Sequence, residues 1–187
     1  MTEHAHAPHG GSKRIALLIS VLALLLAVVE TGVNSAQTEV FTRNVEAANL
    51  WSFFQARTIR QTTVRTAAEQ AELDAQAVGD AAARSAIAAQ QKAWRDTAAR
   101  WESEPATGEG RRELAERARA AEAARDRFLA KYHLYEYAAA AFQVAIVVAS
   151  ASIVTEVALL AGVGVAFGVV GIALGALGWL APTLIHL

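Results

Sequence analysis

Few side chains in this sequence combine the residue types and spacings that catalysis requires. The 187 residues include no cysteine. The sequence also offers no nucleophile beside a base, no paired carboxylates on an apolar wall and no glycine-rich loop for phosphate. We therefore expect neither enzymatic activity nor a bound cofactor.

The amino-terminal tail, residues 1–14, holds three histidines at short spacing. Imidazoles spaced in this way chelate transition metals, which makes His4, His6 and His9 weak candidates for metal ligands. The tail contains no cysteine, and its polar composition is equally typical of a solvated chain end. We expect no metal site.

Two polar residues within apolar segments are candidates for an ion path. Glu30 lies near the end of the first apolar run, where a carboxylate either reaches the lipid headgroups or serves an ion or proton site inside a helix bundle. Gln143 lies within the second run, where its amide can hydrogen-bond across helices. A structural role is the alternative for both residues.

The apolar residues are concentrated at the two ends of the chain and the charges in its middle. Apolar residues make up 54% of the sequence, while all but two of the 17 Lys+Arg and all but three of the 18 Asp+Glu lie within residues 34–136. This separation is typical of a membrane protein. The net charge of -1 excludes a strongly basic protein that binds nucleic acid.

Three apolar runs are long enough to cross a bilayer, which requires about 20 residues for a helix. The first, residues 15–33, is also consistent with a cleaved signal peptide, but the helical pattern continues beyond it and favours an uncleaved anchor. Residues 137–154 and 157–180 form the second and third spans, and Thr155 and Glu156 between them predict a very tight turn.

Basic and aromatic residues beside the spans indicate how the chain sits in the membrane. Lys13 and Arg14 place the amino terminus in the cytoplasm, which puts residues 34–136 in the periplasm of a bacterial inner membrane. Aromatic rings with polar tips anchor helices at the headgroups. The residues expected to do so just before the second span are Tyr132, Tyr135 and Tyr137.

The middle region, residues 34–136, is rich in alanine and charged residues and therefore favours long helices. Small apolar side chains recur about every 3.6 residues from Val64 to Ala93, as on one face of a helix. Because alanine buries little area, this stripe needs a closely packed partner helix. Its central members are Ala68, Ala71, Ala75, Ala82, Ala86 and Ala89.

The stripe predicts one helix that continues through Gly79, although Gly79-Asp80 also fits a helix end followed by a cap. The breaker-rich segment 103–110 is the predicted turn at which the chain reverses. A helix over 34–102 would extend about 104 Å, whereas 111–136 can return only about 39 Å. We therefore expect a bend in the outgoing helix and neighbouring subunits that cover the excess.

The third span carries glycines at intervals of three and four residues. In lipid, such a face allows helix backbones to approach closely and to gain dispersion energy and weak hydrogen bonds. The sequence does not show whether the partner is a helix of the same chain or of another subunit. The glycines of this face are Gly164, Gly168, Gly171, Gly175 and Gly178.

An aromatic and basic motif follows the first span in the segment 51–60. Trp51 and Phe54 share one helix face, which favours a helix-helix core over a ligand pocket. The motif, with Gln55 and Arg57, resembles the signature of a bacterial family, domain of unknown function 4337, and residues 131–146 resemble that family's entry into its second span. The resemblance covers nearly the whole chain and implies an architecture, but no activity.

The sequence therefore predicts an all-α membrane protein with three transmembrane helices and a long Ala-rich helical hairpin, or coiled coil, between the first and second spans. Its expected partners are the lipid bilayer, further copies of the chain and another membrane protein. The leading hypothesis is a self-associating scaffold or assembly subunit. The alternatives are a small oligomeric pore or transporter accessory subunit, with Glu30 and Gln143 on its path, and a sensor whose middle region binds another protein.

Overall fold

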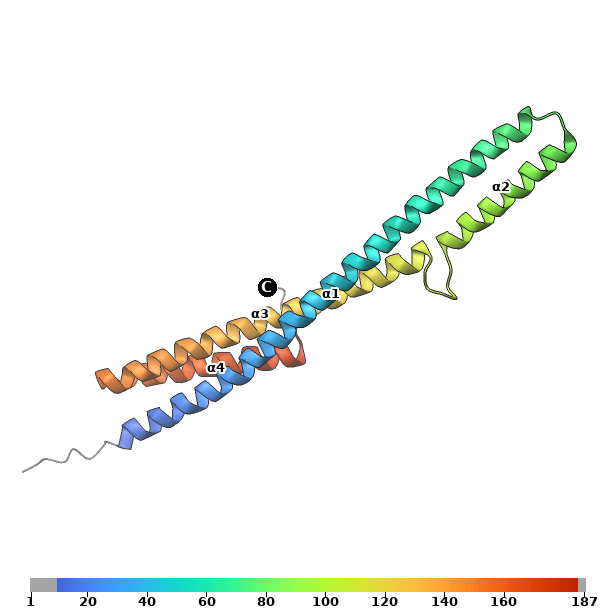
Figure 1. The fold of residues 1–187 in the computed structure, drawn as a ribbon. Helices are drawn as coiled ribbons and strands as arrows, with labels where there is room; N and C mark the ends of the chain where they lie inside the picture. Colours follow the sequence, from blue (N-terminus) through green and yellow to red (C-terminus); the bar gives the residue numbers. More distant parts are fainter. Residues whose placement is uncertain (1–9, 185–187) are drawn as a thin grey trace, which may run out of the picture. The chain divides into compact units, whose positions relative to one another are not determined.

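The structure is a computed structural model that describes residues 10–184, with side chains from Lys13 onward (Figure 1). The described residues form four helices and no strand, so the predicted all-α class is confirmed. His4, His6 and His9 lie outside the described residues. The helices are α1 (Gly10–Ala77), α2 (Ala81–Glu102), α3 (Arg111–Thr155) and α4 (Ala158–Leu180).

The chain divides into two compact units. The apolar unit comprises Met1–Phe41 and Arg125–Leu187, and the hairpin unit comprises Thr42–Ala124. Helices α1 and α3 each contribute residues to both units. Three helices, α1, α3 and α4, are long and apolar enough to cross a membrane, as the sequence predicts.

In the apolar unit, helices α1, α3 and α4 pack around a small core. Leu22 of α1 lies buried with Phe142 and Ala145 of α3. Helix α4 contributes small residues to this packing, since four of its glycines are buried. The large side chains that remain exposed on these helices, such as Leu24 and Val147, suit a lipid environment.

The connection between α3 and α4 is a tight turn at Glu156 and Val157. Glu156 has a φ of 57°, in the left-handed region that is uncommon for residues other than glycine. The Ser152 hydroxyl donates to the Val157 carbonyl at 3.1 Å and satisfies one backbone group of the turn. Helix α3 therefore ends at Thr155, one residue beyond the predicted end of the second span.

In the hairpin unit, the chain reverses at residues 78–80, so the prediction of one helix through Gly79 is wrong. Helix α1 ends at Ala77, and Asp80 caps α2 by accepting a hydrogen bond from the Ala83 backbone N–H at 2.8 Å. The Arg84 guanidinium donates to the Val78 carbonyl at 2.7 Å. A glycine followed by an N-cap residue is the ordinary chemistry of such a helix end and start.

The break at 78–80 also changes which alanines face the partner helix. Ala68 and Ala71 of α1 are buried and Ala75 is half-buried. After the break α2 begins with a new phase, so the predicted positions Ala82, Ala86 and Ala89 are exposed. The positions of α2 that are buried or half-buried instead are Ala83, Ile87, Gln91, Trp94, Thr97, Ala98, Trp101 and Glu102.

Residues 103–110 form a loop between α2 and α3 but do not reverse the chain, which corrects the predicted turn. Both helices run antiparallel to α1 (Figure 1), as the contacts of Gln61 with Ala98 and of Thr58 with Arg111 show. In this unit 36 residues of α1 lead outward, and 22 residues of α2 with 14 of α3 lead back. The helical residues of each arm extend about 54 Å. The outgoing and returning arms are therefore equal in length, and no part of the outgoing helix is left without a partner helix in this unit.

Candidate functional site

The densest set of polar contacts lies in the hairpin unit, where the end of α2 and the start of α3 meet α1. We call the network of Thr58, Gln61, Glu102 and Arg111 the three-helix junction. Gln61 is only 2% exposed, yet its amide is fully used. Its nitrogen donates to the Ala98 carbonyl at 2.9 Å and to Glu102 Oε2 at 3.0 Å, and its oxygen accepts from Arg111 Nη1 at 2.8 Å.

Arg111 connects all three helices at the junction. Its Nε donates to the Thr58 hydroxyl at 2.9 Å on α1, and its Nη1 pairs with Glu102 Oε2 at 2.8 Å on α2. The guanidinium also lies 5.0 Å from the centre of the Phe54 ring, a cation–π distance. Because the polar groups of the network are paired with one another across α1, α2 and α3, the junction holds the three helices together.

The family-like motif supplies the apolar side of this junction. Trp51 and Phe54 pack edge to face, with ring centres 5.4 Å apart. The indole N–H of Trp51 donates to Glu122 Oε1 of α3 at 2.9 Å. Gln55, by contrast, is exposed. The buried residues against which the two rings pack are Ala47, Leu50, Leu114, Ala118 and Ala121.

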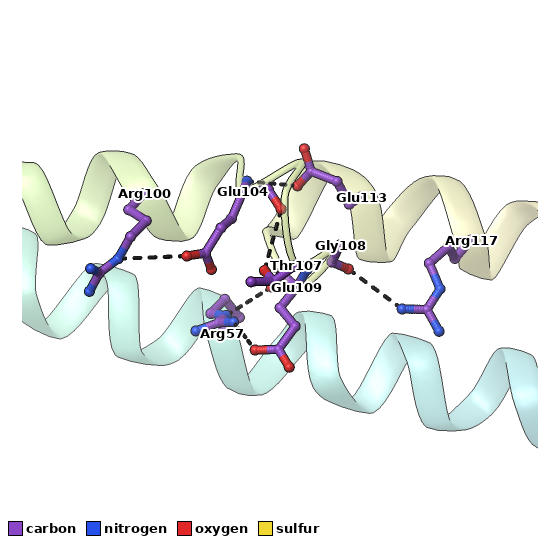
Figure 2. Close-up of polar contacts among 8 residues, drawn as sticks. All are labelled: Arg57, Arg100, Glu104, Thr107, Gly108, Glu109, Glu113 and Arg117. Atoms are coloured by element: carbon purple, nitrogen blue, oxygen red, sulfur yellow. Dashed lines mark hydrogen bonds and ion pairs between the residues drawn. The ribbon is translucent and has the colours of Figure 1, made fainter.

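Arg57, the basic residue of the motif, fixes the loop at residues 103–110 to α1 (Figure 2). Its Nε donates to the Glu109 carbonyl at 3.0 Å, and its Nη2 pairs with the Glu109 carboxylate at 3.1 Å. The guanidinium lies 5.9 Å from the centre of the Trp101 ring. Three of the four motif residues therefore hold α3, its preceding loop or the end of α2.

Glu113 closes the loop from the first turn of α3. Its carboxylate accepts from the Ser103 hydroxyl at 2.6 Å. It also accepts from the Glu104 backbone N–H at 3.1 Å, a contact drawn in Figure 2. Gly110 is buried beneath this contact, and a methyl group there would collide with Glu113 Oε2 and lie 2.5 Å from the Glu104 nitrogen. Gly108 has a φ of 68°, which also favours glycine.

Two carboxylates of the hairpin unit, Glu102 at the junction and Glu113 at the neighbouring loop, predict a loss of stability in acid. The hydrogen bond from Gln61, together with the charge of Arg111, lowers the pKa of Glu102 below its ordinary value of 4.5. The Ser103 hydroxyl lowers the pKa of Glu113 in the same direction. A carboxylate whose pKa is lower in the folded protein stabilises the fold above its ordinary pKa, and this contribution disappears as the pH falls through the lowered value.

We therefore expect faster amide hydrogen exchange around Gln61 and Ala98 at about pH 3 than at about pH 5, after correction for intrinsic exchange rates. The Glu102→Gln variant should begin with less protection and show a smaller acid dependence. Equal acid dependence in wild type and variant would contradict the role assigned to this carboxylate.

The five glycines of the predicted face lie against helices of their own chain. A methyl group at Gly164 would lie 3.0 Å from the Ala145 carbonyl oxygen, one at Gly168 would lie 2.8 Å from Leu22, and one at Gly171 would lie 2.9 Å from the Phe142 ring. Gly178 is equally close to Tyr135, whereas Gly175 has more space. The glycine face is therefore occupied by α1 and α3 within the apolar unit.

The remaining predicted residues of the apolar unit do not form a common site. Glu30 and Gln143 are both exposed on its outside. Tyr137 is exposed and Tyr132 is half-buried, but Tyr135 lies between Gly178 of α4 and Gly32 of α1, where an added methyl group would lie 2.8 Å from its ring. Gly32, Gln61 and Arg111 were not among the residues predicted from the sequence. A signal for Gln61 is its position seven residues after Phe54, on the same helix face.

The family described as Domain of unknown function (DUF4337) matches residues 11–181. The chain belongs to this family. No curated protein and no solved structure matches the chain. Membership in the DUF4337 family confirms the resemblance that Trp51, Phe54, Gln55 and Arg57 indicate, and the matched range covers both the three-helix junction and the glycine face of α4.

Proposed function

We infer that this DUF4337 chain is a non-enzymatic, membrane-anchored helical protein that associates with its own copies and acts as a scaffold or assembly subunit. We place it in a bacterial inner membrane with a cytoplasmic amino terminus, because Lys13 and Arg14 precede the first span. The observation that carries the proposal is an exposed, uncharged stripe along α1 in the hairpin unit.

This outer stripe turns away from α2 and α3. Its positions recur on average every 3.5 residues, the repeat that keeps two helices in contact along a coiled coil. All are exposed and none is charged. The stripe consists of Val45, Ala48, Ser52, Gln55, Ile59, Thr62, Thr66, Gln70 and Leu73.

Three large apolar side chains give the outer stripe its drive to associate. Val45 is 57% exposed, Ile59 68% and Leu73 60%, although they lie beyond the apolar run that crosses the membrane. Ser52 presents little polar surface, because its hydroxyl donates to the Ala48 carbonyl of the same helix at 2.9 Å. A second copy of the same stripe would cover these side chains without bringing like charges together.

The glycine face of α4 supports contact between copies less strongly than the outer stripe does. Its glycines already touch α1 and α3 of the same chain. We therefore place self-association in the hairpin unit. The glycines of α4 instead pack against α1 and α3 within each apolar unit.

The alternative function is a small oligomeric pore or a transporter accessory subunit. It is supported by Gln143, whose amide is exposed on a membrane-spanning helix although polar groups in lipid favour a partner. Ion flux through vesicles that contain the purified chain, altered by Glu30→Gln, would favour the pore. A scaffold should carry no flux in either form.

The proposal is tested by particle mass in lipid nanodiscs or a mild neutral detergent. We expect wild type to be larger than one copy, and Ile59→Glu combined with Leu73→Glu to be monomeric, because the new carboxylates face each other between copies. Ala86→Glu and Ala89→Glu on the exposed face of α2 form the matched control and should leave the mass unchanged. A monomeric wild type, or dissociation only in the α2 variant, would contradict the assigned surface.

A further inference from the structure

A groove of about 440 Å³ lies in the hairpin unit between α1 and α3, beside the loop at residues 103–110. Three arginines, Arg57, Arg60 and Arg117, line it together with apolar side chains that include Phe53 and Leu114. This volume is in the range of small-molecule sites, which combine an apolar surface with a few polar groups that orient the ligand. None of these five residues belongs to the outer stripe of α1.

The guanidinium groups of the groove are only partly neutralised. Arg57 pairs with Glu109, the one carboxylate in the lining. Arg117 reaches only the Gly108 carbonyl, at the long distance of 3.5 Å (Figure 2). Arg60 makes no hydrogen bond or ion pair with any residue that the structure describes. The groove therefore holds two guanidinium groups without a carboxylate partner.

The apolar part of the groove lies next to these charges. Phe53 is 63% exposed although it neighbours the buried core residues Leu50 and Leu114. An exposed aromatic ring beside unpaired guanidinium groups suits a ligand with an apolar part and an anionic end. The carboxylate of Glu109 at Arg57 shows that a carboxylate fits the guanidinium geometry of this groove.

We propose that the groove binds a small amphiphilic carboxylate, whose carboxylate group pairs with Arg60 and Arg117 and whose apolar part covers Phe53. This site is independent of self-association through the outer stripe. The Glu109 carboxylate pairs with Arg57 and adds a negative charge to the groove, so its removal should favour an anionic ligand.

The test is calorimetric titration of octanoate into the full chain in phosphatidylcholine nanodiscs, with empty nanodiscs as the reference. We expect saturable binding of octanoate, at least tenfold weaker binding of acetate, which lacks the chain, and no saturable binding of octylammonium, which has the opposite charge. Arg60→Gln and Phe53→Ala should each weaken octanoate binding about tenfold, whereas Glu109→Gln should strengthen it.

Lys92→Gln is the matched control for the loss of one cation, because Lys92 lies on α2 outside the groove and pairs with Asp96. It should bind octanoate as wild type does. Circular dichroism of each variant should be unchanged, since Arg60 and Phe53 are exposed. Absence of saturable binding, equal binding of octylammonium, or wild-type affinity in both Arg60→Gln and Phe53→Ala would overturn the proposal.

Discussion

Replacement of Arg111 by alanine is expected to destabilise the hairpin unit by about 3 kcal/mol, because it leaves a buried amide and a carboxylate without their shared cation. The variant loses the hydrogen bonds to Thr58 and Gln61 and the ion pair with Glu102. Gln61 cannot turn to water, since its side chain is almost completely buried. The loss should be local to the junction.

Hydrogen exchange measured by mass spectrometry in neutral detergent separates this local effect from global unfolding. We expect Arg111→Ala to remove protection from α2 near Ala98 and from α1 near Gln61. Arg112→Ala is the matched control, because the neighbouring Arg112 is exposed and makes no junction contact. Arg111→Lys should restore only part of the protection, since an ammonium cannot donate in the same planar arrangement. Equal protection in the two alanine variants would show that the junction contributes little.

Replacement of Gly164 by leucine is expected to destabilise the apolar unit by about 3 kcal/mol, since overpacking at a close helix contact forces the helices apart. Even a methyl group at Gly164 would lie 3.0 Å from the Ala145 carbonyl oxygen and 3.2 Å from the Ala149 side chain. The carbonyl belongs to the α3 backbone, so only a shift of a whole helix can make room.

The control for this prediction lies two residues away on the same helix. Gly162 has no atom within 4 Å of an added methyl group, so Gly162→Leu introduces the same side chain without a clash. We expect the melting temperature in mild detergent to fall clearly for Gly164→Leu and to stay close to wild type for Gly162→Leu. A similar fall for both variants would indicate an effect of composition and not of helix contact.

The sequence is sufficient to predict the all-α class and the three membrane-spanning helices, because their apolar runs are long and almost uninterrupted. It also locates the break between α3 and α4 to within one residue, because the polar pair Thr155-Glu156 separates two such runs and α3 ends at Thr155. These features depend on local composition alone. Each is visible without knowledge of which helices pair.

The course of the chain in the hairpin unit is not predictable in the same way. Alanine is so frequent between residues 64 and 93 that a periodic stripe can be drawn through a helix break, and the stripe conceals the reversal at Gly79-Asp80. The real phase of α2 is set by its contacts with α1, such as that between Gln91 and Ala68. Small side chains give a weak periodic signal because each buries little area.

The three-helix junction illustrates a second limit. Gln61 and Arg111 are 50 residues apart in the sequence. Their pairing depends on the loop at residues 103–110, after which α3 continues along α1 from the point where α2 ends. Periodicity within one helix does not reveal where the next helix begins along its partner. The motif at Trp51 and Phe54 predicts a helix-helix core, but only the structure identifies α3 as the partner.

Disulfide formation between copies tests the central claim most directly, because the chain contains no cysteine of its own. Single variants Ser52→Cys, Ile59→Cys and Thr66→Cys on the outer stripe, and Glu116→Cys and Arg119→Cys on the exposed side of α3, are oxidised in liposomes and separated on a non-reducing gel. We predict dimers for the three stripe positions and monomers for the two on α3. Monomers at all three stripe positions, or dimers in equal yield at all five, would contradict self-association through α1.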